Sequence, residues 1–293
     1  MSQQTRLQKI LPFLACPHCQ GDLKYEPSGL CCLACSNTYK IRNGKIYFCD
    51  HVGPHDDLNS FKGRLKKTLG KYYYSIGVDI IAPDYPFNFK KTLLRYVNPH
   101  EQIVVDIGCG NRRIHDDIIC LDFTDYDEVD IVSDLQKLPF KKESVDAFVS
   151  RSVLEHVKKP WEIADKIAEC TKKGGWGLHV IPFLYPFHAS PDDFHRFTHH
   201  GVRELFGGWK TEEQRSVAGP ISAFLAFFIE FLSIVFSFGS TRLRGYLYLV
   251  FCLMLFPFKF LDCLFLRFSS FMSISLMTLT VLQKKESIRE NLD

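Results

Sequence analysis

Residues 105–110 have the sequence Val105-Asp106-Ile107-Gly108-Cys109-Gly110, an apolar run that ends in a carboxylate and enters a glycine turn. The run indicates a buried parallel strand. Glycine suits the turn because the backbone must adopt unusual φ values and let a ligand approach closely. A dinucleotide-binding loop would have a third glycine at the start of a helix, whereas Asn111-Arg112-Arg113 follows here. The pattern therefore favours another kind of ligand.

Strand and helix patterns alternate after this turn. We expect strands over residues 118–121, 129–133, 145–150 and 176–181, and a helix over 161–171 that stops at Gly174-Gly175. Such alternation implies right-handed crossovers and a parallel sheet, whose ligand lies at the carboxyl ends of the strands. Asp122, Asp134 and Ser152 follow three of these strands, so we expect them beside the ligand. A carboxylate at the position of Asp122 can accept hydrogen bonds from both ribose hydroxyls of a nucleoside.

Residues 100–210 resemble the class I S-adenosylmethionine-dependent methyltransferases of the type 11 group. The motifs that carry the resemblance are Asp106-x-Gly108-x-Gly110, Asp134 with Leu138-Pro139-Phe140, Leu154-Glu155-His156-Val157 and Lys172-x-Gly174-Gly175. The resemblance implies an α/β fold with a Rossmann-like seven-stranded methyltransferase sheet. It also implies S-adenosylmethionine as cofactor, with Asp134 near the adenine. The expected cofactor-binding residues are Asp106, Gly108, Cys109, Gly110, Asp122, Asp134, Leu135, Ser152 and Tyr85.

The chain departs from the family pattern between the first two strands. Eleven residues separate Gly110 from Asp122, too few for a normal crossover helix. A loop or a vestigial helix must replace it. A similar shortening occurs in a subgroup associated with bacterial glycan and cell-envelope loci. Arg112 and Arg113 in this loop either hold an acidic acceptor near the cofactor or are solvated loop charges.

Four cysteines near the N-terminus have the spacing of a metal site. Cys16-x-x-Cys19 and Cys32-x-x-Cys35 can bring four thiolates around a tetrahedral Zn²⁺, which would supply stability that so small a segment lacks. Cys31 is an alternative to Cys32, although Cys32 keeps the paired spacing. Residues 12–48 resemble the Trm112-type zinc ribbon, found alone and fused to methyltransferases. That resemblance implies a structural zinc and a surface for a protein partner.

The segment after the fifth strand is expected to hold the methyl acceptor, since it faces the cofactor. Its candidate catalytic residues are His188, Asp193 and His195, because a histidine or carboxylate can take the proton of an acceptor hydroxyl. Asp193 and Arg196 alternatively form an ion pair across the turn. We expect His156 to be a pocket or packing residue rather than a base. Thr198 can cap the next helix.

The rest of the chain divides by composition. Residues 1–50 form the predicted zinc ribbon, 51–98 a basic and aromatic connector that acts as cofactor lid, and 99–293 the methyltransferase domain. The lid is assigned to Tyr72-Tyr73-Tyr74 and Tyr85. The connector also carries basic side chains that can bind anionic lipid or RNA, or that form a solvated helix face. They are Lys62, Arg64, Lys66, Lys67 and Lys71.

Residues 221–268 are so apolar that they need cover from lipid, a partner chain or the domain itself. We interpret them as a helical insertion and membrane hairpin, before a closing antiparallel strand over about 273–283. A buried dimer or core element is the alternative. Neither apolar run is a clean transmembrane span.

The 293 residues carry a net charge of only +3, which gives no general case for nucleic-acid binding. The polar first ten residues predict no secretory signal, and the paired cysteines suit a reducing compartment. We expect a cytoplasmic protein, peripheral or monotopic at the inner face of the cytoplasmic membrane, that methylates a small-molecule, glycan or lipid-linked acceptor. An RNA methyltransferase with a zinc-finger module and a non-catalytic cofactor-binding scaffold are the alternatives.

Overall fold

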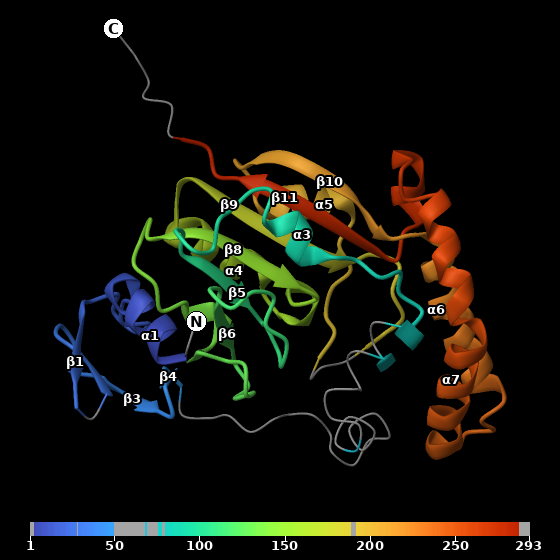
Figure 1. The fold of residues 1–293 in the computed structure, drawn as a ribbon, viewed down its shortest axis with the longest axis horizontal. Helices are drawn as coiled ribbons and strands as arrows, with labels where there is room; N and C mark the ends of the chain where they lie inside the picture. Colours follow the sequence, from blue (N-terminus) through green and yellow to red (C-terminus); the bar gives the residue numbers. More distant parts are fainter. Residues whose placement is uncertain are drawn as a thin grey trace, which may run out of the picture.

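A computed structural model describes residues 3–27, 29–49, 68, 76–77, 80–188 and 192–286. The proposed lid tyrosines Tyr72-Tyr73-Tyr74 lie outside the described residues, as do Lys62, Arg64, Lys66, Lys67 and Lys71. Figure 1 shows a central sheet with the N-terminal strands at one end and a helical hairpin at the other.

The central sheet has the strand order β7-β6-β5-β8-β9-β11-β10. Its strands are β5 (Val104–Ile107), β6 (Ile119–Asp122), β7 (Ile131–Val132), β8 (Val145–Arg151), β9 (Thr171–Pro182), β10 (Lys210–Ala218) and β11 (Met277–Gln283). The strands from β7 to β9 are parallel, and β11 lies antiparallel between β9 and β10. The predicted Rossmann-like seven-stranded sheet with a closing antiparallel strand is confirmed.

The N-terminal segment extends this sheet. After α1 (Gln3–Ile10) and η1 (Leu11–Phe13) come the antiparallel strands β1 (Leu23–Glu26), β2 (Gly29–Cys32), β3 (Thr38–Arg42) and β4 (Lys45–Tyr47). β4 pairs parallel to β7, with Ile46 opposite Ile131 and Tyr47 opposite Val132. Leu14 and Ile46 are buried in the same apolar core as Phe140. The cysteine-bearing ribbon is therefore continuous with the central sheet.

Helices and short 3₁₀ turns connect the strands. They are α3 (Phe89–Leu93), η3 (Leu135–Lys137), η4 (Leu154–His156), α4 (Pro160–Cys170) and α5 (His199–Leu205). Thr198 caps α5, as expected, because its side chain accepts a hydrogen bond from the Gly201 N–H. Between β5 and β6 the described chain has no helix, which confirms the predicted loss of the first crossover helix.

The prediction that α4 stops at Gly174-Gly175 is wrong. α4 ends at Cys170, and Thr171 already begins β9, with its hydroxyl bonded back to the Ile167 carbonyl at 2.6 Å. The glycines lie within β9 beside a register shift against β8. A Cβ on Gly175 would stand 2.8 Å from the Asp146 carbonyl oxygen. Glycine is therefore needed here because the two strands pack closely, and it does not mark the end of a helix.

Both interpretations of Arg113 are also wrong, because its side chain is only 7% exposed. Its guanidinium pairs with Asp130 and with Glu128, both at 3.0 Å, and donates to the Ile118 carbonyl at 2.6 Å. Arg6 from α1 reaches the same Asp130 carboxylate at 3.0 Å. Arg113 therefore stabilises the loop that replaces the missing helix, and its guanidinium is already occupied by these partners.

The apolar insertion forms a helical hairpin between β10 and β11. It consists of α6 (Pro220–Val235), α7 (Thr241–Leu255), η5 (Phe256–Leu264) and η6 (Ser269–Ile274). Asp262 fixes its base: the buried carboxylate accepts hydrogen bonds from the N–H groups of Gly219, Ile221 and Ser222 at 2.8–3.0 Å, and so caps α6. The predicted helical insertion is confirmed.

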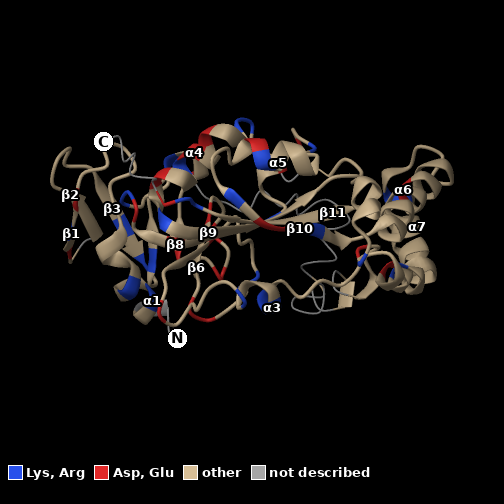
Figure 2. Cartoon of the chain, turned by 90° about the horizontal axis from the view of Figure 1, so that it is seen from above, with Lys and Arg blue, Asp and Glu red and all other residues tan. Residues whose placement is uncertain are grey.

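Most large apolar side chains of the hairpin remain exposed. Phe224 is 62% exposed, Phe231 60% and Phe238 89%. Residues Thr241–Leu264 form a helical stretch long and apolar enough to cross a membrane, with a mean hydropathy of 1.9 and little burial. Figure 2 shows charges of both signs over the central domain and few on the hairpin. The hairpin thus presents an uncovered apolar surface.

Candidate cofactor and acceptor site

A cavity of about 540 Å³ lies at the carboxyl ends of the parallel strands. Its lining includes Gly108, Gly110, Asp122, Asp134, Leu135 and Ser152. These residues follow four different strands, because parallel strands deliver their carboxyl ends to one edge of the sheet. The structure therefore brings six of the nine expected cofactor-binding residues to one cavity.

The glycine turn after β5 forms one wall of this cavity. Gly108 has φ +65° and Gly110 φ +59°, values that favour glycine. A Cβ on Gly108 would lie 2.5 Å from a methyl group of Val153, so only hydrogen fits there. The Gly108 N–H donates to the Leu121 carbonyl at 2.8 Å. The Gly110 N–H donates to the Asp122 carboxylate at 2.8 Å, which locks the turn to the end of β6.

Asp122 is well placed for a ribose. Its two carboxylate oxygens accept one backbone hydrogen bond each, from Gly110 and from Thr124. Each oxygen keeps a further lone pair for a ligand hydroxyl. Burial raises the pKa of Asp122, and the backbone hydrogen bonds oppose that shift.

Asp106 lies beneath the turn and is 1% exposed. Neither of its carboxylate oxygens accepts a hydrogen bond from a described residue, and the Arg151 guanidinium stands 3.7 Å away. Burial raises its pKa to about 7. A buried carboxylate with unused acceptors beside a cavity fits a cationic ligand group, and S-adenosylmethionine carries an ammonium and a sulfonium.

Besides Asp106, two expected residues do not line the cavity. The Cys109 side chain packs into a small core with Cys120, Val129 and Val132 on the other side of the turn. Tyr85 is wrong as a cofactor lid: its N–H donates to the Ser222 hydroxyl at 2.9 Å and its ring meets Phe260 of the hairpin. It belongs to the base of the hairpin because the chain before α3 runs along that element.

The three catalytic candidates have different surroundings. Asp193 pairs with Arg196, whose guanidinium reaches both carboxylate oxygens at 2.5 and 2.6 Å and holds the Asp193 pKa well below its usual range. Asp193 also accepts the His188 N–H at 2.9 Å, so it fixes the turn and is a poor base. His195 packs near Trp161, with Nε2 3.3 Å from the Lys158 carbonyl. His188 lies beside two further ionisable groups, one of which lines the cavity.

Those groups are Glu155 and His156, which the sequence analysis left without a chemical role. Glu155 Oε1 lies 3.7 Å from His156 Nε2 and 3.7 Å from His188 Nε2. The two imidazole rings are 4.9 Å apart, and His156 lines the cavity. The motif Leu154-Glu155-His156 directly after a strand was a usable signal, since the carboxyl ends of strands carry the sites of such sheets.

The four cysteines come together as expected. The sulfur atoms of Cys16, Cys19, Cys32 and Cys35 all lie within 4.8 Å of one another. The Cys16–Cys35 and Cys19–Cys32 distances are 3.7 and 3.4 Å, near the edge of about 3.8 Å of a tetrahedron with Zn–S bonds of about 2.3 Å. Backbone N–H groups of Cys35 and Ala34 help to lower the pKa of Cys32 to about 6. The donor set fits zinc.

Part of the chain is similar to known methyltransferases. Residues 105–178 match a family model described as a methyltransferase domain. An uncharacterized methyltransferase of Mycolicibacterium vanbaalenii is 41% identical over 51 residues, which are 17% of this chain and 20% of that protein. The match thus spans about a fifth of the length of this curated relative.

Two solved structures are similar to this chain at low sequence identity. Phosphoethanolamine N-methyltransferase 2 of Haemonchus contortus, in complex with phosphomonomethylethanolamine and S-adenosylhomocysteine, is 14% identical, with a TM-score of 0.50 and coverage of 80% of this chain and 61% of that one. A complex between the Haloferax volcanii Trm112 methyltransferase activator and a methyltransferase is 19% identical, with a TM-score of 0.43 and coverage of 80% and 98%. Residues 105–178 thus match a methyltransferase domain, and they lie within a Rossmann-like sheet.

Proposed function

We propose that this protein transfers the methyl group of S-adenosylmethionine to a hydroxyl of a cell-envelope glycan or lipid-linked acceptor. The observation that carries the proposal is the cavity of about 540 Å³, which has strand-end carboxylates on one side and His156 with Asp192 and Phe194 on the other. Asp122 and Asp134 would hold the adenosine, and His156, with Glu155 and His188 beside it, would lie on the acceptor side.

The reaction is an in-line displacement. The acceptor oxygen attacks the methyl carbon, the carbon–sulfur bond breaks, and its electron pair stays on sulfur to give S-adenosylhomocysteine. The hydroxyl proton must leave the oxygen, and His156, which lines the cavity and lies beside Glu155 and His188, is a base that can take it. The protein contributes alignment of the two substrates and removal of that proton.

The N-terminal ribbon, on this proposal, holds one structural Zn²⁺ on Cys16, Cys19, Cys32 and Cys35. Zinc fits because the four sulfurs already gather at tetrahedral separations. Tyr39 supports the set, since its hydroxyl lies 3.0 Å from the Cys16 sulfur and can donate to a thiolate. The ribbon would stabilise the β4–β7 edge of the sheet and leaves its far side available to a protein partner.

The hairpin, on this proposal, lies in the inner leaflet of the cytoplasmic membrane. Its exposed phenylalanines would otherwise remain in water, and a soluble surface rarely carries so large an apolar patch. Lysine and arginine side chains near the helix ends can reach the headgroups. The active site would then face acceptors anchored in lipid.

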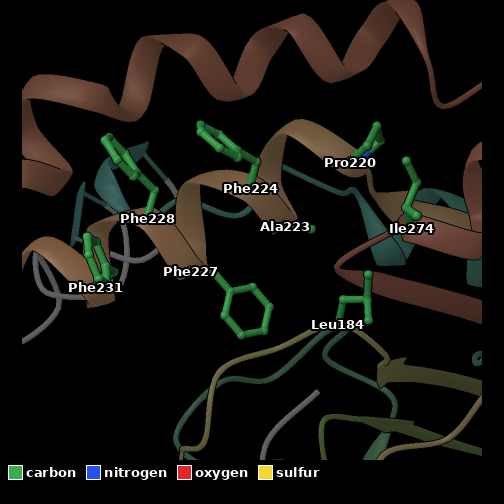
Figure 3. A pocket seen from close by; sticks show the side chains of 8 residues that line it. All are labelled: Leu184, Pro220, Ala223, Phe224, Phe227, Phe228, Phe231 and Ile274. Atoms are coloured by element: carbon green, nitrogen blue, oxygen red, sulfur yellow. The ribbon is translucent and has the colours of Figure 1, made fainter.

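An apolar groove connects the hairpin with the acceptor loop. Its volume is about 450 Å³, and Figure 3 shows Phe227 of α6 and Leu184 of the loop after β9 on its two sides. Leu184 lies only four residues before His188 in the sequence. A hydrocarbon chain in this groove would place its polar head near the acceptor cluster, which favours a lipid-linked acceptor over a free glycan.

Label transfer tests the function. The purified chain would be incubated with S-adenosylmethionine labelled in the methyl group and with separate lipid, glycan and RNA extracts of a strain that lacks the gene. We expect label in the lipid extract, and none with the Asp122→Ala variant. The same deletion should accumulate one envelope species lighter by a methyl group. Label in RNA alone would overturn the acceptor assignment.

A further inference from the structure

We propose that Glu155, His156 and His188 form a binding site for one divalent first-row metal ion at the acceptor side of the cavity. The site is distinct from the cysteine cluster and uses two imidazole nitrogens and one carboxylate oxygen, which all lie within 4.8 Å of one another. Two histidines and a carboxylate with open positions are a ligand set typical of Fe²⁺ or Mn²⁺ in proteins.

The first argument is the buried carboxylate. Glu155 is fully buried, and neither of its side-chain oxygens accepts a hydrogen bond from a described residue. Its backbone carbonyl accepts the N–H groups of Phe194 and His195 at 2.8 and 3.2 Å, so the residue is firmly held. A buried carboxylate is costly unless it is paired or coordinates a metal. The Arg196 guanidinium is already paired with Asp193.

The second argument is the orientation of the two histidines. His156 Nδ1 lies 2.5 Å from the Asp192 carbonyl, and His188 Nδ1 lies 3.2 Å from the Pro186 carbonyl. A carbonyl only accepts, so the Nδ1 of His156 carries the hydrogen, and in a neutral ring the lone pair is then on Nε2. His188 Nδ1 has two acceptors, the Pro186 carbonyl and Asp193 Oδ2 at 3.4 Å, against one donor, the Arg196 guanidinium at 3.4 Å, and this balance favours the same tautomer. Metal-binding histidines are oriented in the same way by an acceptor behind the ring.

The third argument is that three lone pairs converge. Both Nε2 atoms face Glu155 Oε1 at 3.7 Å. Ligands about 2.1 Å from a shared ion are about 3.0 Å apart in an octahedron and about 3.4 Å in a tetrahedron. The two Nε2–Oε1 distances would therefore shorten by about 0.3 Å around a tetrahedral cation and by about 0.7 Å around an octahedral one. The alternative that satisfies the same atoms is a protonated histidine paired with Glu155.

The ion would have open positions toward the cavity, because His156 lines it beside Val153 and Phe194. A Lewis acid there would bind the acceptor hydroxyl, lower its pKa and let its proton pass to solvent. This catalytic role rests on the proposed methyl transfer. The binding of the ion does not, and it can be measured without donor or acceptor.

The test uses the full chain with its cysteine site loaded with zinc and Mn²⁺ as the probe, since Mn²⁺ prefers oxygen and nitrogen ligands to thiolates. Electron paramagnetic resonance of unbound Mn²⁺ gives the stoichiometry. We expect one site per chain, and a loss of at least tenfold in affinity for Glu155→Gln and for His188→Asn. His195→Asn, in the same loop but outside the cluster, should bind Mn²⁺ as the wild type does.

Two readouts keep the outcome clear. Zinc content and S-adenosylhomocysteine binding report whether each variant is folded. Pulsed resonance of Mn²⁺ bound to the wild type should show coupling to two histidine nitrogens, which needs no variant at all. The absence of a saturable Mn²⁺ site, or wild-type affinity in Glu155→Gln, would overturn the metal site in favour of the ion pair. Mn²⁺ binding without methyl transfer would instead contradict the proposed function.

Discussion

The exposed hairpin makes a quantitative prediction about membrane binding. Phe224 and Phe231 on α6 are 62% and 60% exposed. Taking roughly 200 Å² for a phenylalanine side chain, each ring would remove about 120 Å² from water on entering lipid, or about 3 kcal/mol at ~25 cal/mol per Å². The double variant Phe224→Ser, Phe231→Ser should thus lose up to about 6 kcal/mol, a factor of about 10⁴ in partitioning.

Sedimentation with neutral phosphatidylcholine vesicles measures this loss. The wild type should pellet with the vesicles and stay bound in high salt, because burial in lipid is not screened as ionic attraction is. A phenylalanine ring that enters only the headgroup interface removes less apolar area from water than a ring that enters the hydrocarbon core. We therefore expect the double variant to bind the vesicles at least a hundredfold more weakly than the wild type. Tyr25→Ser is the matched control, since Tyr25 is 60% exposed on the ribbon at the opposite end of the molecule.

A weakening of less than threefold, or release of the wild type by salt, would refute the membrane hairpin. If the wild type is a soluble dimer that the double variant converts to monomers, α6 is a protein interface instead. Detergent-free ultracentrifugation separates these outcomes.

Three further predictions follow from buried charges and the cysteine cluster. Burial raises the Asp106 pKa to about 7, so affinity for S-adenosylmethionine should fall as the pH drops below about 7, and calorimetry of Asp106→Asn should show a flatter profile. The sign for stability is opposite: the folded carboxyl holds its proton more tightly than the unfolded one, so the cofactor-free protein should lose stability as the pH rises from about 4 to 7. Arg113→Met leaves the buried Asp130 carboxylate with Arg6 and the Cys120 N–H, and urea unfolding should show a loss of about 3 kcal/mol, against little change in Arg203→Met on the exposed side of α5. Elemental analysis should find about one zinc per chain in the wild type, and the Cys32→Ser variant should lose that zinc. A folded ribbon without metal would contradict the zinc assignment.

The fold was largely predictable from the sequence. The apolar run into Asp106 and Gly108 defines a strand and a tight turn by local chemistry alone, and each later strand repeats that pattern. The end of α4 was predicted wrongly because a pair of glycines such as Gly174-Gly175 often follows a helix. Here Gly175 is needed because β9 packs closely against β8, a contact that only the tertiary structure reveals. The pairing of β4 with β7 has no local signal either, since it joins residues about 85 positions apart.

The cofactor side of the site was easier to predict than the acceptor side. Its residues end successive strands, so their meeting point follows from topology. The acceptor cluster depends on how the loop after β9 folds back. The ion pair of Asp193 with Arg196, one of the two alternatives that the sequence left open, is confirmed. Arg113 was misinterpreted because its partner Asp130 lies on another segment, and a sequence does not show which charges are buried together.

The central claim is that the strand-end cavity binds S-adenosylmethionine, and calorimetry tests it most directly. We predict one cofactor per chain in the wild type. Asp122→Ala should weaken binding by about 1–3 kcal/mol, the cost of a lost charged hydrogen-bond pair, while zinc content stays unchanged. Gly110→Val, whose side chain would enter the open space at the cavity wall, should weaken it further. Wild-type affinity in both variants would contradict the account.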